Sequence, residues 1–338
     1  MLPGTSLSVN PLPGTFAASP RTQISLLGVP GGDLRAVRVN GSLTGRHPGQ
    51  LRGYSQGDGA SFIPRAAFRS GELVTVRGNI RRGSRVKPFA FSFTVANQDP
   101  VPYVAQRTPP RRAGEVVHFH SRHDLVPPAI VVTARTAIAS SSARAHAAAR
   151  SDAGLIFATP YTGPGQAGPL IFDEAGNVVW FAPLPRGISA ENLQVEQLDG
   201  QPVLTYWRGR IPPQGFGQGE EVILSGAYRQ VGRVHAGNGY AVDLHDFHLG
   251  PRDTAVFTVF NPIHCDLSPV GGPRGSGVTD GAFQEVDLRT GLVRREWHSI
   301  DHVALGDSYQ TPVTASSSWP FDYFHINSVV SQPDGTTL

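Results

Sequence analysis

Cysteine is almost absent from this sequence of 338 residues: Cys265 is the only one, so no intramolecular disulfide can form. No stretch reaches about 18 consecutive apolar residues, which excludes a membrane-spanning helix. Residues 1–20 lack the basic and apolar segments of a signal peptide, so none is predicted there. Charged residues make up only 16% of the chain, and the net charge is +3.

Several functional classes are excluded by missing motifs. The basic residues are scattered without a recognition helix or zinc module, so nucleic-acid binding is not expected. Walker, dinucleotide-binding and GxSxG motifs are absent, and no cofactor is predicted. The glycine-rich run 215–219 has no helix after it, which favours a loop over a phosphate cradle. HFHSRH (118–123) has metal-like spacing, but no fourth ligand accompanies it and no metal site is expected.

Glycine (39) and proline (29) are abundant, which favours many turns and an all-β protein. After an extended segment over residues 1–20, short alternating apolar runs predict an immunoglobulin-like β-sandwich over residues 21–96. The clearest alternating run comprises Phe89, Phe91, Phe93 and Val95. The proline-rich stretch 97–114 has the composition of a linker. The alanine- and serine-rich segment 135–150 fits a short surface helix or a loop, and we favour the loop.

Residues 115–338 contain two kinds of β-hairpin that alternate along the chain. One kind spans 170–181, 222–234 and 283–297, and the other spans 195–207, 244–260 and 326–338. Two hairpins per repeat of roughly 50 residues predict the four-stranded blades of a β-propeller. A generic β-sandwich with chance similarity is the alternative.

About three blades are present, whereas propellers close with roughly four to eight. The last hairpin is interrupted soon after its Asp334-Gly335 turn, because the sequence ends at Leu338. We therefore expect an incomplete β-propeller and a C-terminally truncated piece of a longer protein. Exposed sheet edges in an open propeller support this expectation.

Stretches over residues 150–338 resemble the bacterial arylsulfotransferase family. They are GPLIFDEAGNVVWF, NLQVEQLDGQPVLTYWRG, AGNGYAVDLHDFHL, DGAFQEVDLRTGLVRREW and PFDYFHINSV. The earlier runs SPRTQISLLG and GYSQGDGASFIP resemble the sandwich that precedes the propeller in actinobacterial members. Single stretches are weak signals, but their order and spacing across half of the chain are more specific.

The resemblance implies transfer of a sulfuryl group from a phenolic sulfate ester to a phenolic acceptor through a histidine intermediate. The donor is not a nucleotide sulfate, and the expected partners are small phenolic sulfates and phenols. Family habit also implies an extracellular or cell-envelope location. The alternative is a non-catalytic secreted propeller with a binding or adhesion role, because propellers host unrelated functions. The sequence indicates no oligomeric state.

Sulfuryl transfer needs a nucleophile, donors to the sulfonate oxygens and a proton donor for the leaving phenolate, and histidine can serve in each role. His325 and His245 lie in the stretches that resemble the family, and we expect them to meet on the propeller axis as catalytic residues. Strand parity would place His245 and His248 on opposite faces, and we favour His245. The alternative for each histidine is a purely structural role at the end of a strand.

Three more residues are candidates for substrate binding. Tyr323 and Trp319 could stack on a phenol ring, although core packing is the commoner role of such aromatic residues. Asn327 could orient His325 or cap a turn. In the family, an accepting histidine and an arginine follow the His325 motif, so both are expected beyond Leu338. The chain alone is therefore expected to be inactive.

Overall fold

The computed structural model describes residues 1–99, 113–133, 154–160, 163–332 and 336–338. Within these ranges the regular elements are antiparallel β-strands and single turns of 3-10 helix, which confirms the all-β prediction. The 3-10 turns are η1 (Gly31–Asp33), η2 (Ser268–Val270), η3 (Ser299–Asp301), η4 (Leu305–Asp307) and η5 (Pro312–Thr314). The predicted linker in large part, the segment 135–150 and the Asp334-Gly335 turn lie outside the described residues.

The N-terminal part is a sandwich of two four-stranded sheets. One sheet has the order β1 (Ser8–Asn10), β2 (Ile24–Leu27), β6 (Gly59–Pro64), β5 (Gly49–Gly53). The other has the order β4 (Gly45–His47), β3 (Leu34–Gly41), β7 (Leu73–Arg82), β8 (Arg85–Thr94). Phe89, Phe91 and Phe93 of β8 point into the shared core, as their alternation predicts. Immunoglobulin-like connectivity stays a prediction.

The sandwich begins before residue 21, in contrast to the expected extended segment 1–20. Strand β1 pairs with β2, and Leu2 and Leu7 are buried in the sandwich core. Burying these two leucines removes apolar surface from water, which favours the docking of this proline-rich segment onto the first sheet.

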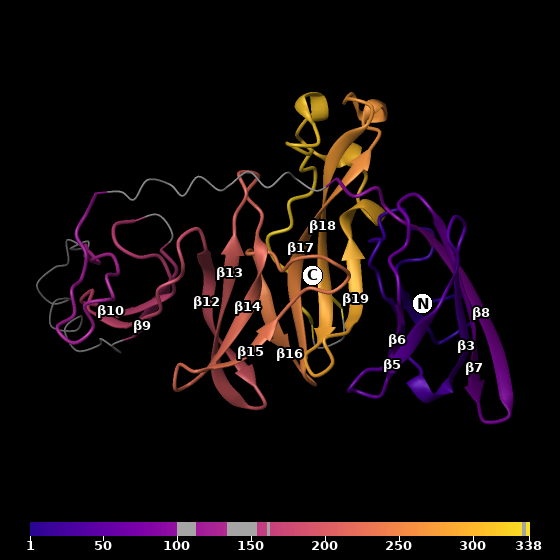
Figure 1. The fold of residues 1–338 in the computed structure, drawn as a ribbon, viewed down its shortest axis with the longest axis horizontal. Helices are drawn as coiled ribbons and strands as arrows, with labels where there is room; N and C mark the ends of the chain where they lie inside the picture. Colours follow the sequence, from indigo (N-terminus) through magenta and orange to yellow (C-terminus); the bar gives the residue numbers. More distant parts are fainter. Residues whose placement is uncertain (100–112, 134–153, 161–162, 333–335) are drawn as a thin grey trace, which may run out of the picture.

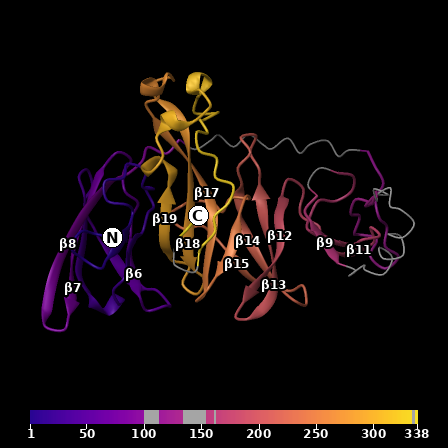
Figure 2. The same ribbon diagram turned by 180° about the vertical axis from the view of Figure 1, so that it is seen from behind.

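Three antiparallel sheets follow, each formed by strands in chain order. The first contains β9 (Leu155–Ala158), β10 (Leu170–Asp173) and β11 (Val178–Phe181). The second contains β12 (Ser189–Leu198), β13 (Gln201–Arg210), β14 (Gln218–Ser225) and β15 (Gln230–Val234). The third contains β16 (Phe247–Gly250), β17 (Thr254–Cys265), β18 (Ser276–Asp287) and β19 (Val293–His298). These sheets are the blades of an incomplete β-propeller, and they stand side by side in Figures 1 and 2.

The predicted hairpins correspond to five strand pairs of these blades: β10–β11, β12–β13, β14–β15, β16–β17 and β18–β19. Local turn chemistry explains the agreement. In the β10–β11 turn, Asp173 Oδ1 accepts hydrogen bonds from the backbone N–H groups of Ala175 (2.9 Å) and Asn177 (2.8 Å), and Gly176 adopts a φ of 86°. For the sixth hairpin, over 326–338, the described residues contain only an isolated bridge between Ser331 and Thr337.

The first strands of the blades lie next to one another, because β12 contacts both β9 and β16. At the far side of the third blade, β19 faces the sandwich: the hydroxyls of Ser25 and Tyr54 both donate to the carbonyl oxygen of Val293, at 2.6 and 2.7 Å. The sandwich therefore abuts the third blade, and the first blade lies at the opposite end of the molecule (Figure 1).

Candidate functional site

His245 and His325, 80 residues apart in the chain, meet edge to face. Their Nε2 atoms are 3.2 Å apart, and the ring planes are inclined at 87°. The side chains are 18% and 36% exposed, so a ligand can reach the pair from solvent. The structure thus brings together the two histidines that the sequence singled out.

The Nδ1 atom of each ring is hydrogen-bonded to a carboxylate. Asp243 Oδ2 lies 2.7 Å from Nδ1 of His245, and Asp322 Oδ2 lies 2.5 Å from Nδ1 of His325. Because a carboxylate accepts hydrogen bonds, each Nδ1 carries a proton. A hydrogen bond between the two Nε2 atoms requires a proton on one of them, and that ring would then be an imidazolium.

Asp243 is itself fixed by the surrounding backbone. It accepts hydrogen bonds from the N–H of Gly217 (2.5 Å) and from the Thr258 hydroxyl (2.9 Å). A Cβ at position 217 would lie 2.6 Å from the backbone nitrogen of Leu244, so only glycine allows this approach. The glycine-rich run 215–219 therefore supports the aspartate that orients His245.

The environment of His245 favours its charged form. Burial of the ring lowers the pKa, but the hydrogen bond and the negative charge of Asp243 outweigh burial and raise the pKa of His245 above 6.5. Asp322 and Glu191 add to this electrostatic effect. His245 therefore holds its proton more strongly than a histidine in water does.

Glu191 is a third ionisable group of the site that sequence reasoning missed. It lies on β12 at an irregularity in the pairing with β13, where Asn192 has a φ of 55°. The Thr159 hydroxyl, just after β9, donates to its Oε2 at 3.1 Å. Burial raises the pKa of Glu191, while Thr159 and His245 oppose the rise. Thr159, Glu191 and His245 thus come from the three successive blades, and His325 comes from the segment that follows them.

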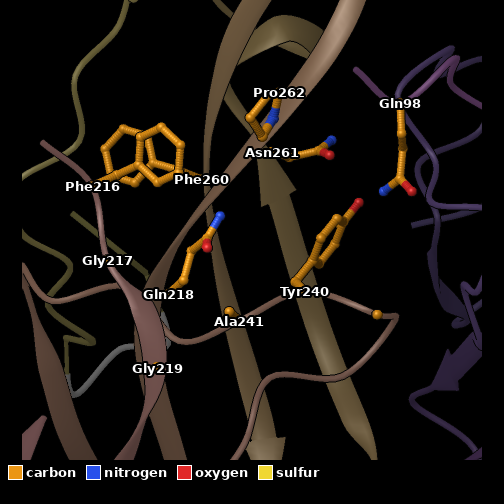
Figure 3. A pocket seen from close by; sticks show the side chains of 11 residues that line it. Gln98, Phe216, Gly217, Gln218, Gly219, Tyr240, Ala241, Phe260, Asn261 and Pro262 are labelled. Carbon is orange, nitrogen blue, oxygen red and sulfur yellow. The ribbon is translucent and has the colours of Figure 1, made fainter. Parts of the chain in front are cut away.

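An aromatic wall flanks the histidine pair. The ring centroid of Phe260 lies 5.6 Å from that of His245 and 5.1 Å from that of His325. Phe216 stacks on Phe260 at 5.5 Å and 14°. Both phenylalanines also line a cavity of about 380 Å³ (Figure 3), so the cavity and the histidine pair share this wall.

The other predicted site residues lie elsewhere. Tyr323 is 6% exposed in a core cluster and donates its hydroxyl proton to Ser299 at 2.9 Å. Trp319 is 55% exposed, and Asn327 is also exposed. The described contacts of the two histidines include none of these three residues, and Asp322 occupies the orienting position expected of Asn327. Their role in substrate binding stays a prediction.

The described ion pairs of His248 are with two carboxylates and not with the histidine pair, and residues 244 and 245 form a bend and not a strand. Its Nδ1 lies 3.0 Å from Glu196 Oε1, and its Nε2 lies 3.2 Å from Asp246 Oδ1. The hydrogen bonds to Asp246 and Glu196 raise the pKa of His248 to about 10. Asp246 also accepts from the N–H of Val329 at 2.8 Å, which ties the His325 segment to the third blade.

This arrangement makes stability depend on pH. Because the folded-state pKa of His248 is raised to about 10 from 6.5, its contribution is complete below about pH 6.5 and is lost as the pH rises through about 10. We expect His248→Gln to flatten the loss of stability between about pH 6.5 and 10 in urea unfolding. The exposed His120→Gln should keep the wild-type slope, and equal slopes in all three proteins would contradict the assignment.

Comparison with known proteins gives a family match over part of the chain. Residues 194–338 match the model of a family described as arylsulfotransferase (ASST). No curated protein matches. The described part of the chain contains no helix that is long and apolar enough to cross a membrane.

Two solved structures from Listeria monocytogenes are among the matches. They are the uncharacterized protein lmo2446 of strain EGD-e, in complex with glucose, magnesium and calcium, and a cycloalternan-forming enzyme in complex with a pentasaccharide substrate. Each is 9% identical over 87% of this chain, with a TM-score of 0.18, which is too low to support an argument. The chain spans only 28% of the length of either structure.

Proposed function

Because residues 194–338 match the arylsulfotransferase family, we propose that the protein transfers a sulfuryl group from a phenolic sulfate ester to a phenolic acceptor without a nucleotide sulfate donor. The single observation that carries this proposal is the 3.2 Å contact between the Nε2 atoms of His245 and His325. We infer that the pair shares a proton and carries one positive charge where a sulfonate group can approach.

The chemistry assigns two tasks to the pair. Its positive charge stabilises the sulfonate oxygens, and its Nε2 proton passes to the phenolate oxygen as the S–O bond breaks. In the first half-reaction the sulfur forms an S–N bond to an accepting histidine. In the second, the acceptor phenol returns its proton to the histidine pair, its oxygen bonds to sulfur, and the S–N bond to the accepting histidine breaks.

The accepting histidine is not assigned to a residue of this chain. Following the family pattern, we place it and a further arginine after the His325 motif. We therefore propose that residues 1–338 alone are inactive. A longer protein that contains them would carry out the transfer. Release to the extracellular space or cell envelope is part of the same proposal, and fractionation of the producing cells tests it.

Glu191 has a supporting electrostatic role in this proposal: its negative charge helps His245 hold its proton. Glu191→Gln should lower the pKa of His245, because one of the groups that raise it is removed. The measurement is a pH titration of ¹⁵N-labelled histidines. Glu196→Gln, on the same strand, is the matched control: it should lower the pKa of His248 and leave His245 unchanged. An unchanged His245 in Glu191→Gln would exclude this role.

A direct assay tests the proposed function. The longer protein is incubated with p-nitrophenyl sulfate, with and without phenol, and nitrophenolate is followed by absorbance. We expect release that depends on the phenol, with phenyl sulfate as product. No release in either condition would reject the enzyme and favour the non-catalytic binding or adhesion role.

A further inference from the structure

The cavity beside the histidine pair has uncharged walls. Phe216 and Phe260 form its apolar wall, and its polar lining comes from Gln98, Gln218, Asn261 and Tyr240. No residue that lines it carries a charge. Figure 3 shows the Tyr240 hydroxyl pointing into the space between Asn261 and Gln98. The walls come from the segment after the sandwich, from the second and third blades, and from the connection 239–241 between these blades.

The Tyr240 hydroxyl is buried and makes no hydrogen bond among the described residues. The nearby Ser19 side chain opposes the rise in the pKa of Tyr240, and its own hydroxyl donates to the Asn238 carbonyl at 2.6 Å. A buried hydroxyl without a partner is energetically unfavourable. A ligand that accepts a hydrogen bond in this cavity would remove that cost.

The electrostatic surroundings select the charge of such a ligand. Burial raises the pKa of Tyr240 well above 10, and the nearby carboxyl groups of Glu296 and Asp280 raise it further. Tyr240 therefore stays a neutral donor at all ordinary pH values. Since no lining residue carries a charge that could pair with a sulfate, an uncharged ring is favoured over a sulfate ester.

We propose that this cavity is a binding site for neutral phenols, with the Tyr240 hydroxyl donating a hydrogen bond to the ligand and the ligand ring packed against the Phe216–Phe260 wall. In identifying the ligand as the acceptor class, this inference rests on the proposed function. It assigns acceptor and donor to different places: the neutral phenol occupies the cavity, and the anionic sulfate ester faces the positively charged histidine pair.

The test is a ¹⁹F NMR titration of the 338-residue chain with 4-fluorophenol and, separately, with 4-fluorophenyl sulfate. We expect 4-fluorophenol to bind and Tyr240→Phe to weaken its binding about tenfold, the scale of one hydrogen bond. The sulfate ester should not compete. Tyr228→Phe, whose ring is 43% exposed and stacks on Trp180, is the matched control and should bind as the wild type does.

Filling the cavity gives a second variant. Ala241 lines the cavity, and Ala241→Leu should abolish binding of 4-fluorophenol while the thermal unfolding transition is retained. Unchanged affinity in both Tyr240→Phe and Ala241→Leu, or equal affinity for the phenol and its sulfate, would overturn the inference. Binding without any transfer by the longer protein would instead reject the proposed function and leave the phenol site intact.

Discussion

Replacing His325 with alanine is expected to lower the proposed sulfuryl transfer by the proposed longer protein at least about a hundredfold, the usual scale for the loss of a transition-state donor. The substitution removes one of the two Nε2 atoms that are proposed to share a proton. His245 then lacks the partner ring with which it would share the proton and the positive charge. The measurement is phenol-dependent release of nitrophenolate from p-nitrophenyl sulfate.

His264→Ala is the matched control for this loss. His264 is 44% exposed, and its nearest carboxylate oxygen, on Asp99, is 3.7 Å away, so transfer should stay near the wild-type rate. His325→Gln keeps a polar side chain of similar length, but it cannot hold a positive charge and should be as inactive as the alanine variant. Near-normal rates in both His325 variants would remove His325 from the site.

Replacing Arg294 with alanine is expected to destabilise the protein by roughly 3 kcal/mol, because it leaves two partly buried carboxylates without their buried cation. Arg294 is 2% exposed on β19, and it donates hydrogen bonds to Asp58 of the sandwich at 2.9 Å and to Glu285 of β18 at 2.8 Å. Its guanidinium also lies over the Tyr54 ring at 5.1 Å. We place the effect at the lower end of the usual range because Asp58 is 32% exposed.

Urea unfolding measures this change, and the next residue supplies the control. Arg295 is 52% exposed and lies 3.5 Å from Glu285 Oε2, so Arg295→Ala should cost less than about 1 kcal/mol. Equal losses in the two variants would show that the buried pair does not hold the sandwich against the third blade. A loss in the Arg294 variant alone would identify Arg294 as the cation that joins the two parts.

The hairpins could be predicted from the sequence because their signals are local. The Asp173–Asn177 turn is fixed by contacts among five neighbouring residues, and the alternation in β8 follows from the pleat of a single strand. The docking of residues 1–20 could not be predicted in the same way. Leu2 and Leu7 are buried by distant residues of the sandwich, and nothing in their own segment indicates that partner.

The same distinction applies to the site. The two aspartates that orient the histidines lie two and three residues before them, in DLH and DYFH, so a local pattern could have identified both. Glu191 and Tyr240 carry no such signature. Each reaches the site through the packing of separate repeats, and their surroundings become visible only in three dimensions. Asn327 was expected to orient His325 because it is near in sequence, but Asp322 makes that contact.

The most direct measurement of the central claim is an NMR experiment on ¹⁵N-histidine-labelled protein that detects coupling through the hydrogen bond between imidazole nitrogens. A proton shared by His245 and His325 predicts a coupling between their Nε2 atoms that disappears in His325→Gln. If the folded wild-type chain shows two uncoupled histidines whose titrations ignore each other, the blades do not bring these side chains together, and the proposed site is wrong.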